Sequence, residues 1–175
     1  MSKSAAAMYL AQFSREGMLS GVTLRFSNIY GAVPMNSTDR GFLAQVAERA
    51  LAGDDLQIFR GCDGRRDFLH VSDAAQSIVD AAEVSGALAS SMYWVGSGDS
   101  IRLSQAFEVV VAEAKKRTGN SSRILKVDDP PGLYPIESRD VVVDSSSFRR
   151  DTSWRPRVSF ESGVRRLLDS ILERS

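Results

Sequence analysis

The sequence predicts an α/β fold. Segments with helical periodicity alternate along the chain with short segments rich in β-branched and apolar residues, which is typical of α/β proteins. The 175 residues are enough for one ordinary domain and too few for two full ones. A composition of 43% hydrophobic and 25% charged residues excludes a disordered or fibrous chain.

The first three predicted elements are a helix, a strand and a loop. Residues 2–16 are rich in strong helix formers, and Gly17 follows as a stop signal. Residues 22–28 alternate apolar and polar side chains, which predicts a strand. Residues 31–40 contain Pro, Asn, Ser, Thr and Asp, which predicts a loop. The sequence therefore opens on a helix, with neither a strand nor a phosphate-binding glycine turn before it.

The middle of the chain predicts two further helices. The first covers residues 42–51 and ends at Gly53, and a short strand over 56–59 follows it. Extended chain resumes over 67–71, after a turn that two glycines bound. A serine and an aspartate then stand at the start of a helix that runs to about Val84, where either can act as the cap.

The last third alternates in the same way. Residues 92–95 predict a strand, Ser104 can cap a helix over 105–118, and residues 123–127 predict another strand. Residues 128–135 hold three prolines and must be irregular. The remaining predicted elements are a strand over 141–143, a short helix over 145–150 and an amphipathic helix over 159–173.

Charge and composition exclude several classes of function. Lys plus Arg and Asp plus Glu both number 22, so the chain lacks the excess positive charge that general nucleic-acid binding needs. Cys62 and His70 are the only residues of their types, which excludes an internal disulfide and a zinc site of the usual ligand count. We expect His70 to be structural, at the end of a strand. No apolar run is long enough to span a membrane, and no signal peptide is visible, so we expect a cytoplasmic protein with no membrane or nucleic-acid partner.

Asn28 is the first candidate ligand-binding residue. It ends the strand over 22–28 and precedes Gly31, which places its amide at the carboxyl end of a sheet. Open α/β sheets bind ligands at that edge. The alternative is that Asn28 only caps a turn between the strand and the loop.

A cluster of arginines in residues 59–73 is the second candidate. Three arginines stand near two glycines, which let guanidinium and backbone groups approach an anion, and Phe59 offers a ring face to a base. The alternative is a polar turn whose arginines pair with Asp63 and Asp67 and add little stability.

Three segments follow family motifs in order and at matching separations. Segment 25–31 (RFSNIYG) is similar to L-R-x-x-N-x-Y-G-P, and segment 66–73 (RDFLHVSD) is similar to R-D-[FWY]-[VIL]-[HY]-V-x-D. Residues 154–156 (WRP), followed by 159–163 (SFESG), are similar to a closing G-W-x-P and s-x-e-e-G pattern. Together they resemble the C-terminal portion of the NAD-dependent nucleotide-sugar epimerase/dehydratase family, the extended short-chain dehydrogenases, from residue 2 to about 172.

The resemblance implies roles for five residues. Asn28 would hydrogen-bond the diphosphate of a nucleotide sugar, and Arg66 would neutralise it. Phe59 has the spacing of an aromatic residue that packs on the base, and Arg139 aligns loosely with a second phosphate contact. Lys3 matches the lysine of a Y-x-x-S-K motif, which binds the nicotinamide ribose of NAD and lowers the pKa of the catalytic tyrosine.

The sequence departs from the family at the catalytic centre. None of its four tyrosines stands four residues before a lysine, so Lys3 is catalytic only if the tyrosine is supplied. The G-x-x-G-x-x-G turn is missing as well, and the glycines at 96 and 98 are expected to form only a turn. The resemblance thus implies a remnant of the dinucleotide-binding domain over 1–31 and a substrate-binding domain over 32–175. Strand 92–95 would return to a partial Rossmann-type sheet.

This leaves three interpretations of function. The leading one is the substrate-binding part of an enzyme that oxidises a sugar at C4 and then re-reduces or dehydrates it, and we expect the chain alone to be inactive. The second is a non-catalytic module that binds a nucleotide sugar or pairs with another protein. The third is a structural protein. Open strand edges also predict a homo-oligomer.

Overall fold

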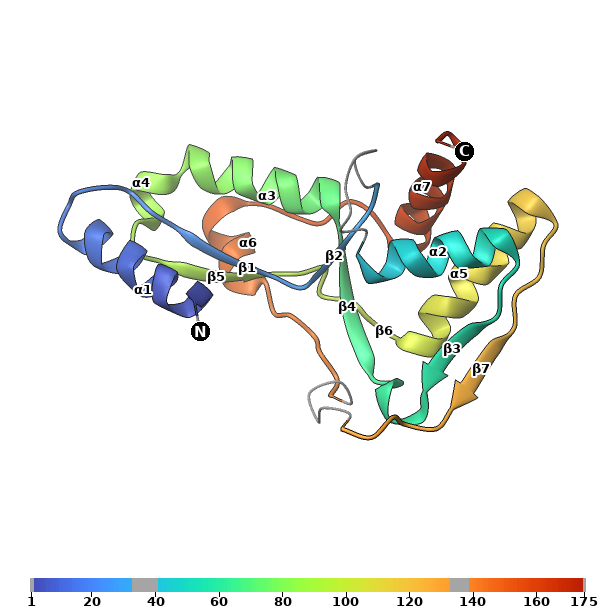
Figure 1. Cartoon of the computed structure of the whole chain (residues 1–175). Helices are drawn as coiled ribbons and strands as arrows, with labels where there is room; N and C mark the ends of the chain where they lie inside the picture. Colours follow the sequence, from blue (N-terminus) through green and yellow to red (C-terminus); the bar gives the residue numbers. More distant parts are fainter. Residues whose placement is uncertain (1, 33–40, 133–138, 175) are drawn as a thin grey trace.

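The computed structural model describes residues 2–32, 41–132 and 139–174 (Figure 1). Its helices are α1 (Ser2–Arg15), α2 (Phe42–Ala52), α3 (Val71–Glu83), α4 (Ser85–Leu88), α5 (Leu103–Thr118), α6 (Ser146–Thr152) and α7 (Phe160–Leu172), with a 3₁₀ turn, η1 (Arg60–Cys62). Its strands are β1 (Thr23–Phe26), β2 (Asn28–Tyr30), β3 (Leu56–Phe59), β4 (Arg65–His70), β5 (Met92–Val95), β6 (Ser100–Arg102) and β7 (Ile124–Val127). Helices and strands alternate, which confirms the α/β class.

The strands of the described residues form three small sheets. β1 pairs with β5, and β3 pairs with β7, both in parallel. The third sheet has the order β2–β4–β6, in which β4 pairs in parallel with β2 and antiparallel with β6. In Figure 1, β2 and β4 lie between two groups of helices: α1, α3, α4 and α6 around β1 and β5, and α2, α5 and α7 towards β3 and β7.

Two hydrophobic cores, built from the part of the chain that the structure describes, meet at β4. The larger core combines buried side chains of α2, α5 and α7 with those of β3, and the smaller core combines those of α3 and α6 with those of β5. Phe68 belongs to the larger core and Leu69 to the smaller one, since successive side chains of a strand point to opposite faces. β4 is therefore the element that joins the two halves of the molecule.

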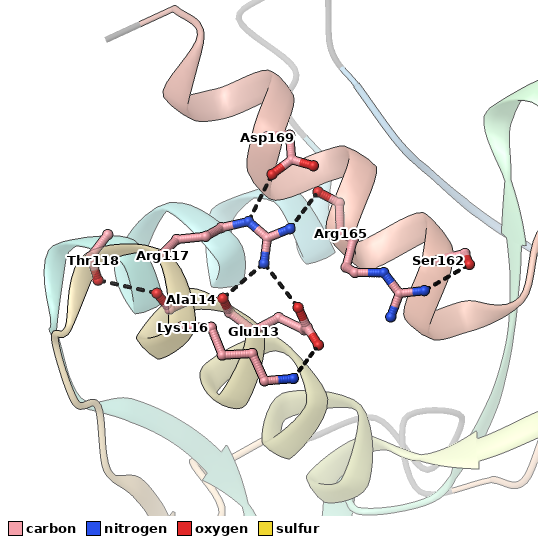
Figure 2. A network of polar contacts seen from close by, with 8 residues as sticks. All are labelled: Glu113, Ala114, Lys116, Arg117, Thr118, Ser162, Arg165 and Asp169. Atoms are coloured by element: carbon pink, nitrogen blue, oxygen red, sulfur yellow. Dashed lines mark hydrogen bonds and ion pairs between the residues drawn. The ribbon is translucent and has the colours of Figure 1, made fainter.

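A network of polar contacts fixes α7 on α5 (Figure 2). The Arg117 guanidinium bonds Asp169 of α7 at 2.7 Å and the Glu113 carboxylate at 2.9 Å, and Nη2 also donates to the Arg165 carbonyl at 3.4 Å. Lys116 completes the network with a 2.8 Å ion pair to Glu113. Hydrogen bonds from Lys116 and Arg117 lower the pKa of Glu113. The network thereby holds the helix whose first turn packs against β2.

The single strand predicted over 22–28 is wrong in one respect, because it consists of two strands. Ser27 separates β1 from β2, and its N–H still donates to the Val95 carbonyl of β5 at 3.0 Å. One residue later, Asn28 is already paired with Phe68 of β4. The chain thus changes from one sheet to another without a turn, and an alternating apolar pattern carries no sign of such a change of partner.

The strand predicted over 141–143 is also wrong, although this stretch does run along β4. Its hydrogen bonds go partly to side chains: Val141 N–H donates to the Arg65 carbonyl at 2.9 Å, whereas Val143 N–H donates to the Asp67 carboxylate at 3.2 Å. A side-chain acceptor in place of a carbonyl interrupts the regular ladder. The short elements α4, β6 and η1 lie outside the predicted ones. Within the ranges described, no helix is both long enough and apolar enough to cross a membrane.

Candidate functional site

Asn28 is held against the backbone of the neighbouring strand. It opens β2, its side chain is exposed, and its Nδ2 donates to the Asp67 carbonyl of β4 at 3.0 Å. A carboxamide nitrogen carries two N–H groups. One N–H therefore orients the side chain, while the other can donate to a ligand oxygen. The amide links two strands, which differs from the turn cap that was the alternative.

Arg66 and Arg139 meet at the start of β4. Arg66 is half-buried, and its Nη1 donates to the Arg65 carbonyl at 3.1 Å and to the Arg139 carbonyl at 2.5 Å. Arg139 lies outside any helix or strand, with an exposed side chain. These bonds fix one arm of a planar guanidinium group, whose forked shape suits phosphate oxygens.

One edge of β4 carries all three groups. The carbonyls of Arg65 and Asp67 are two residues apart on the strand, so they point to the same edge. The first accepts from Val141 of the 139–143 stretch, and the second accepts from Asn28. β6 occupies the opposite edge. The structure thus brings Asn28, Arg66 and the backbone of Arg139 together.

Phe59 lies in a different sheet from these residues. It ends β3, where it pairs with Val127, and its side chain is 37% exposed. The η1 turn follows at once, and Gly61 N–H donates to Asp129 at 2.7 Å, which anchors the turn to the stretch after β7. A Cβ at residue 61 would lie 2.7 Å from that carboxylate, so a larger residue there would displace the exposed Asp129 side chain. The role of Phe59 against a base stays a prediction.

The acidic residue Asp63 of the arginine-rich segment bonds partners other than arginine. Asp63 accepts from the Ser104 N–H at 2.9 Å and pairs with Lys126 at 3.0 Å. Burial opposes the ionised form, but hydrogen bonds from Ser104 and Lys126 keep the pKa of Asp63 below its usual value. This carboxylate holds the start of α5 and does not form the arginine pair that the alternative interpretation expects.

His70 and Tyr30 form a buried aromatic contact behind the site. Their ring centroids are 5.4 Å apart, and the Tyr30 hydroxyl donates to the Phe160 carbonyl at 3.2 Å. His70 caps α3, as its Nδ1 accepts from the Ser72 N–H. Burial lowers the pKa of His70 and raises that of Tyr30. Both rings thus pack behind the site, where Tyr30 is bonded to the backbone at the start of α7 and His70 to the start of α3.

A comparison with protein families assigns the chain. A model described as the NAD dependent epimerase/dehydratase family matches residues 1–96. The chain belongs to this family. The match confirms the family that the motifs resemble.

Curated relatives and solved structures agree with the epimerase/dehydratase family. The chain is 23% identical over 171 residues to a dTDP-4-dehydro-6-deoxyglucose reductase of Escherichia coli, covering 98% of this chain and 51% of the relative. It is 26% identical over 174 residues to a dTDP-glucose 4,6-dehydratase of Xanthomonas campestris, covering 96% and 47%. The fold matches that of UDP-glucose 4-epimerase of Thermotoga maritima, solved with UDP-glucose, with a TM-score of 0.79, 23% identity, and coverage of 98% and 52%. The chain thus spans about half the length of these relatives.

The described residues do not by themselves fit NAD, which several solved relatives bind. Lys3 is exposed on α1, which lies beside β1 and β5 (Figure 1). The glycine turn at 96–98 has its N–H groups engaged, because Gly96 donates to Ser145 and the next two residues donate to Asp67. Those amides cannot cradle a pyrophosphate, and β6 rather than a helix follows the turn.

Sequence reasoning missed the buried carboxylate at the centre of this region. Asp67 is fully buried. It follows Arg65 and Arg66 in β4, and its carboxylate accepts from Val143 of the 139–143 stretch, which contains Arg139. Asp67 belongs to segment 66–73, whose pattern predicts for this aspartate only a pairing with arginine. The signal was its place between apolar Phe68 and the arginines, where a buried acid needs several donors. Across the described ranges, no three His, Cys, Asp or Glu side chains gather as a metal site would require.

Proposed function

We propose that this chain is the substrate-binding, C-terminal part of a nucleotide-sugar epimerase or dehydratase. The observation that carries the proposal is that the Asn28 amide and the Arg66 guanidinium lie on one edge of β4, where the backbone of Arg139 also lies. A diphosphate offers only acceptor oxygens, and this edge supplies a carboxamide N–H and a guanidinium group. Family membership and relatives named for UDP- and dTDP-sugars support the same ligand class.

Each residue has a distinct task in this proposal. Arg66 neutralises the diphosphate, Asn28 donates to one of its oxygens, and Arg139 adds a second cation from the adjoining stretch. Phe59 offers its partly exposed ring to the nucleobase. Lys3 contributes to the nicotinamide ribose site only when a tyrosine and the rest of a dinucleotide site are supplied.

Catalysis by the full enzyme needs groups that the described residues do not provide. In the family chemistry, bound NAD would accept the hydride from C4 of the sugar while a base takes the hydroxyl proton, and it would return the hydride to the sugar, with loss of water in a dehydratase. We therefore expect no product when this chain alone is incubated with NAD and UDP- or dTDP-hexoses. Clear turnover would contradict that expectation. If the complete protein binds nucleotide sugars without turnover, the non-catalytic binding module is the better description.

Calorimetry with UDP and dTDP tests the diphosphate site. Losing the charge-assisted bonds of Arg66 should cost about 2 kcal/mol, so Arg66→Ala should weaken binding about 30-fold. Arg123→Ala is the matched control, because it removes the same charge from an exposed pair with Asp55 at the start of β7. Equal affinities of the wild type and Arg66→Ala would refute this site.

We also propose self-association through the surface around α1, in keeping with the expected homo-oligomer and a cytoplasmic location. Only Ser14 of α1 is buried, and Met8 and Tyr9 are 73% and 67% exposed. Met92 and Trp94 of the adjacent β5 are half-exposed, and a groove of about 610 Å³ runs between α1 and the β1–β5 sheet. Apolar patches of this kind favour association. A strictly monomeric profile in analytical ultracentrifugation would contradict the proposal.

A further inference from the structure

The Asp67 side chain joins three parts of the chain. It is fully buried on β4, and its Oδ1 accepts from the Ser97 N–H at 2.9 Å and from the Ser97 hydroxyl at 2.8 Å. Its Oδ2 accepts from the N–H groups of Gly98 and Val143, both at 3.2 Å. Every one of these donors is neutral. This carboxylate therefore fixes the turn after β5 and the 139–143 stretch at the same point of β4.

The neighbouring backbone is shaped to allow this contact. A Cβ at residue 96 would lie 2.7 Å from Asp67 Oδ2 and 2.6 Å from Val143 Cβ, so Gly96 is required for the close approach. Near the other end of the 139–143 stretch, the Asp140 carboxylate accepts from the Arg65 N–H at 2.7 Å. The 139–143 stretch is thus tied to β4 at both of its ends, in a place where a regular ladder is lacking.

We propose that Asp67 is a positioning residue for the diphosphate site. By bonding Val143, it holds the 139–143 stretch along β4, which keeps Arg139 beside Arg66. Its own side chain is fully buried, so we assign it no direct contact with a ligand. This inference rests on the proposed function, because it assigns Asp67 to the site that Arg66 and Arg139 form.

Asp73 offers a matched control. It is also a buried aspartate, 4% exposed, and its Oδ2 accepts from the N–H groups of Arg157 and Val158 at 3.0 Å each. It therefore anchors the stretch before α7 instead of the 139–143 stretch. Asp67→Ala and Asp73→Ala both leave buried N–H groups without an acceptor, so both should lower stability.

The experiment combines amide hydrogen exchange with calorimetry against UDP. In Asp67→Ala, exchange of residues 139–145 should accelerate about tenfold and UDP affinity should fall about tenfold, while Asp73→Ala should change neither. Asp67→Asn serves if Asp67→Ala does not fold. It keeps the size of the side chain but turns an NH₂ group towards a backbone donor, so it should shift both readouts in the same direction.

The outcomes separate this inference from the proposed function. A wild type that binds neither UDP nor dTDP refutes the proposed site and, with it, any positioning role. If the wild type binds UDP, unchanged exchange at 139–145 in both Asp67 variants overturns the anchor. Faster exchange with unchanged UDP affinity overturns the positioning role.

Discussion

Replacing Gly163 tests how tightly the first turn of α7 sits against β2. A Cβ at residue 163 would lie 2.6 Å from Cζ and 2.8 Å from Cε2 of Tyr30. The ring cannot move aside easily, because Tyr30 is only 6% exposed and its centroid lies 6.1 Å from that of Phe68 and 5.6 Å from that of Phe160. Gly163→Ala therefore forces either α7 or Tyr30 to shift.

The expected cost follows from two opposing effects. Overpacking a filled core costs about 1–3 kcal/mol, and contacts this short to ring carbons place the cost at about 2–3 kcal/mol, whereas alanine gains about 1 kcal/mol of helix propensity over glycine. The net loss of unfolding free energy should be about 1–2 kcal/mol, read as a lower midpoint in urea at an unchanged slope. Gly86→Ala in α4 is the matched control, since its added Cβ meets no atom within 4 Å. A Gly163→Ala protein as stable as the wild type would refute the packing argument.

Two further predictions concern His70 and Arg117. Burial lowers the pKa of His70, so the unfolded chain takes up a proton first as pH falls through about 6.5, and the free energy of unfolding should decrease from about pH 7 to pH 5. His70→Asn keeps a side chain that can cap α3 and should remove that slope, whereas a wild-type profile already flat in this window would contradict the reasoning. Arg117→Met leaves Glu113, whose side chain is 11% exposed, without its guanidinium partner, so it should cost about 1–3 kcal/mol in urea unfolding. The same change at the exposed Arg123 should leave the urea midpoint nearly unchanged, and equal effects at the two positions would count against the α5–α7 network.

Much of the architecture follows from local signals in the sequence. Stop glycines and periodic apolar positions placed most of the long helices and strands, because these signals act within a few residues. The change of sheet at Ser27 could not be predicted, since it depends on the distant partners β5 and β4. The strand β6 could not be predicted for a related reason. Its three residues are too few to show an alternating pattern, and it forms because it pairs with the edge of β4.

The candidate site could likewise be predicted only in part from the sequence. Motifs pointed to Asn28 and Arg66, and the structure places both along β4, yet motifs gave no account of what holds Arg139 near them. In our account, the position of Arg139 depends on Asp67 and on the 139–143 stretch, whose N–H groups bond a backbone carbonyl at Val141 and a side-chain carboxylate at Val143. Sequence patterns record which residue types are present, whereas a buried acceptor shared by two distant segments becomes visible only in three dimensions.

Crystals of the chain grown with UDP would test the central claim most directly. Our account predicts the diphosphate at the edge of β4, with oxygens within hydrogen-bonding distance of the Asn28 amide and the Arg66 guanidinium. A diphosphate bound elsewhere, or one that leaves both of these groups untouched, would contradict it.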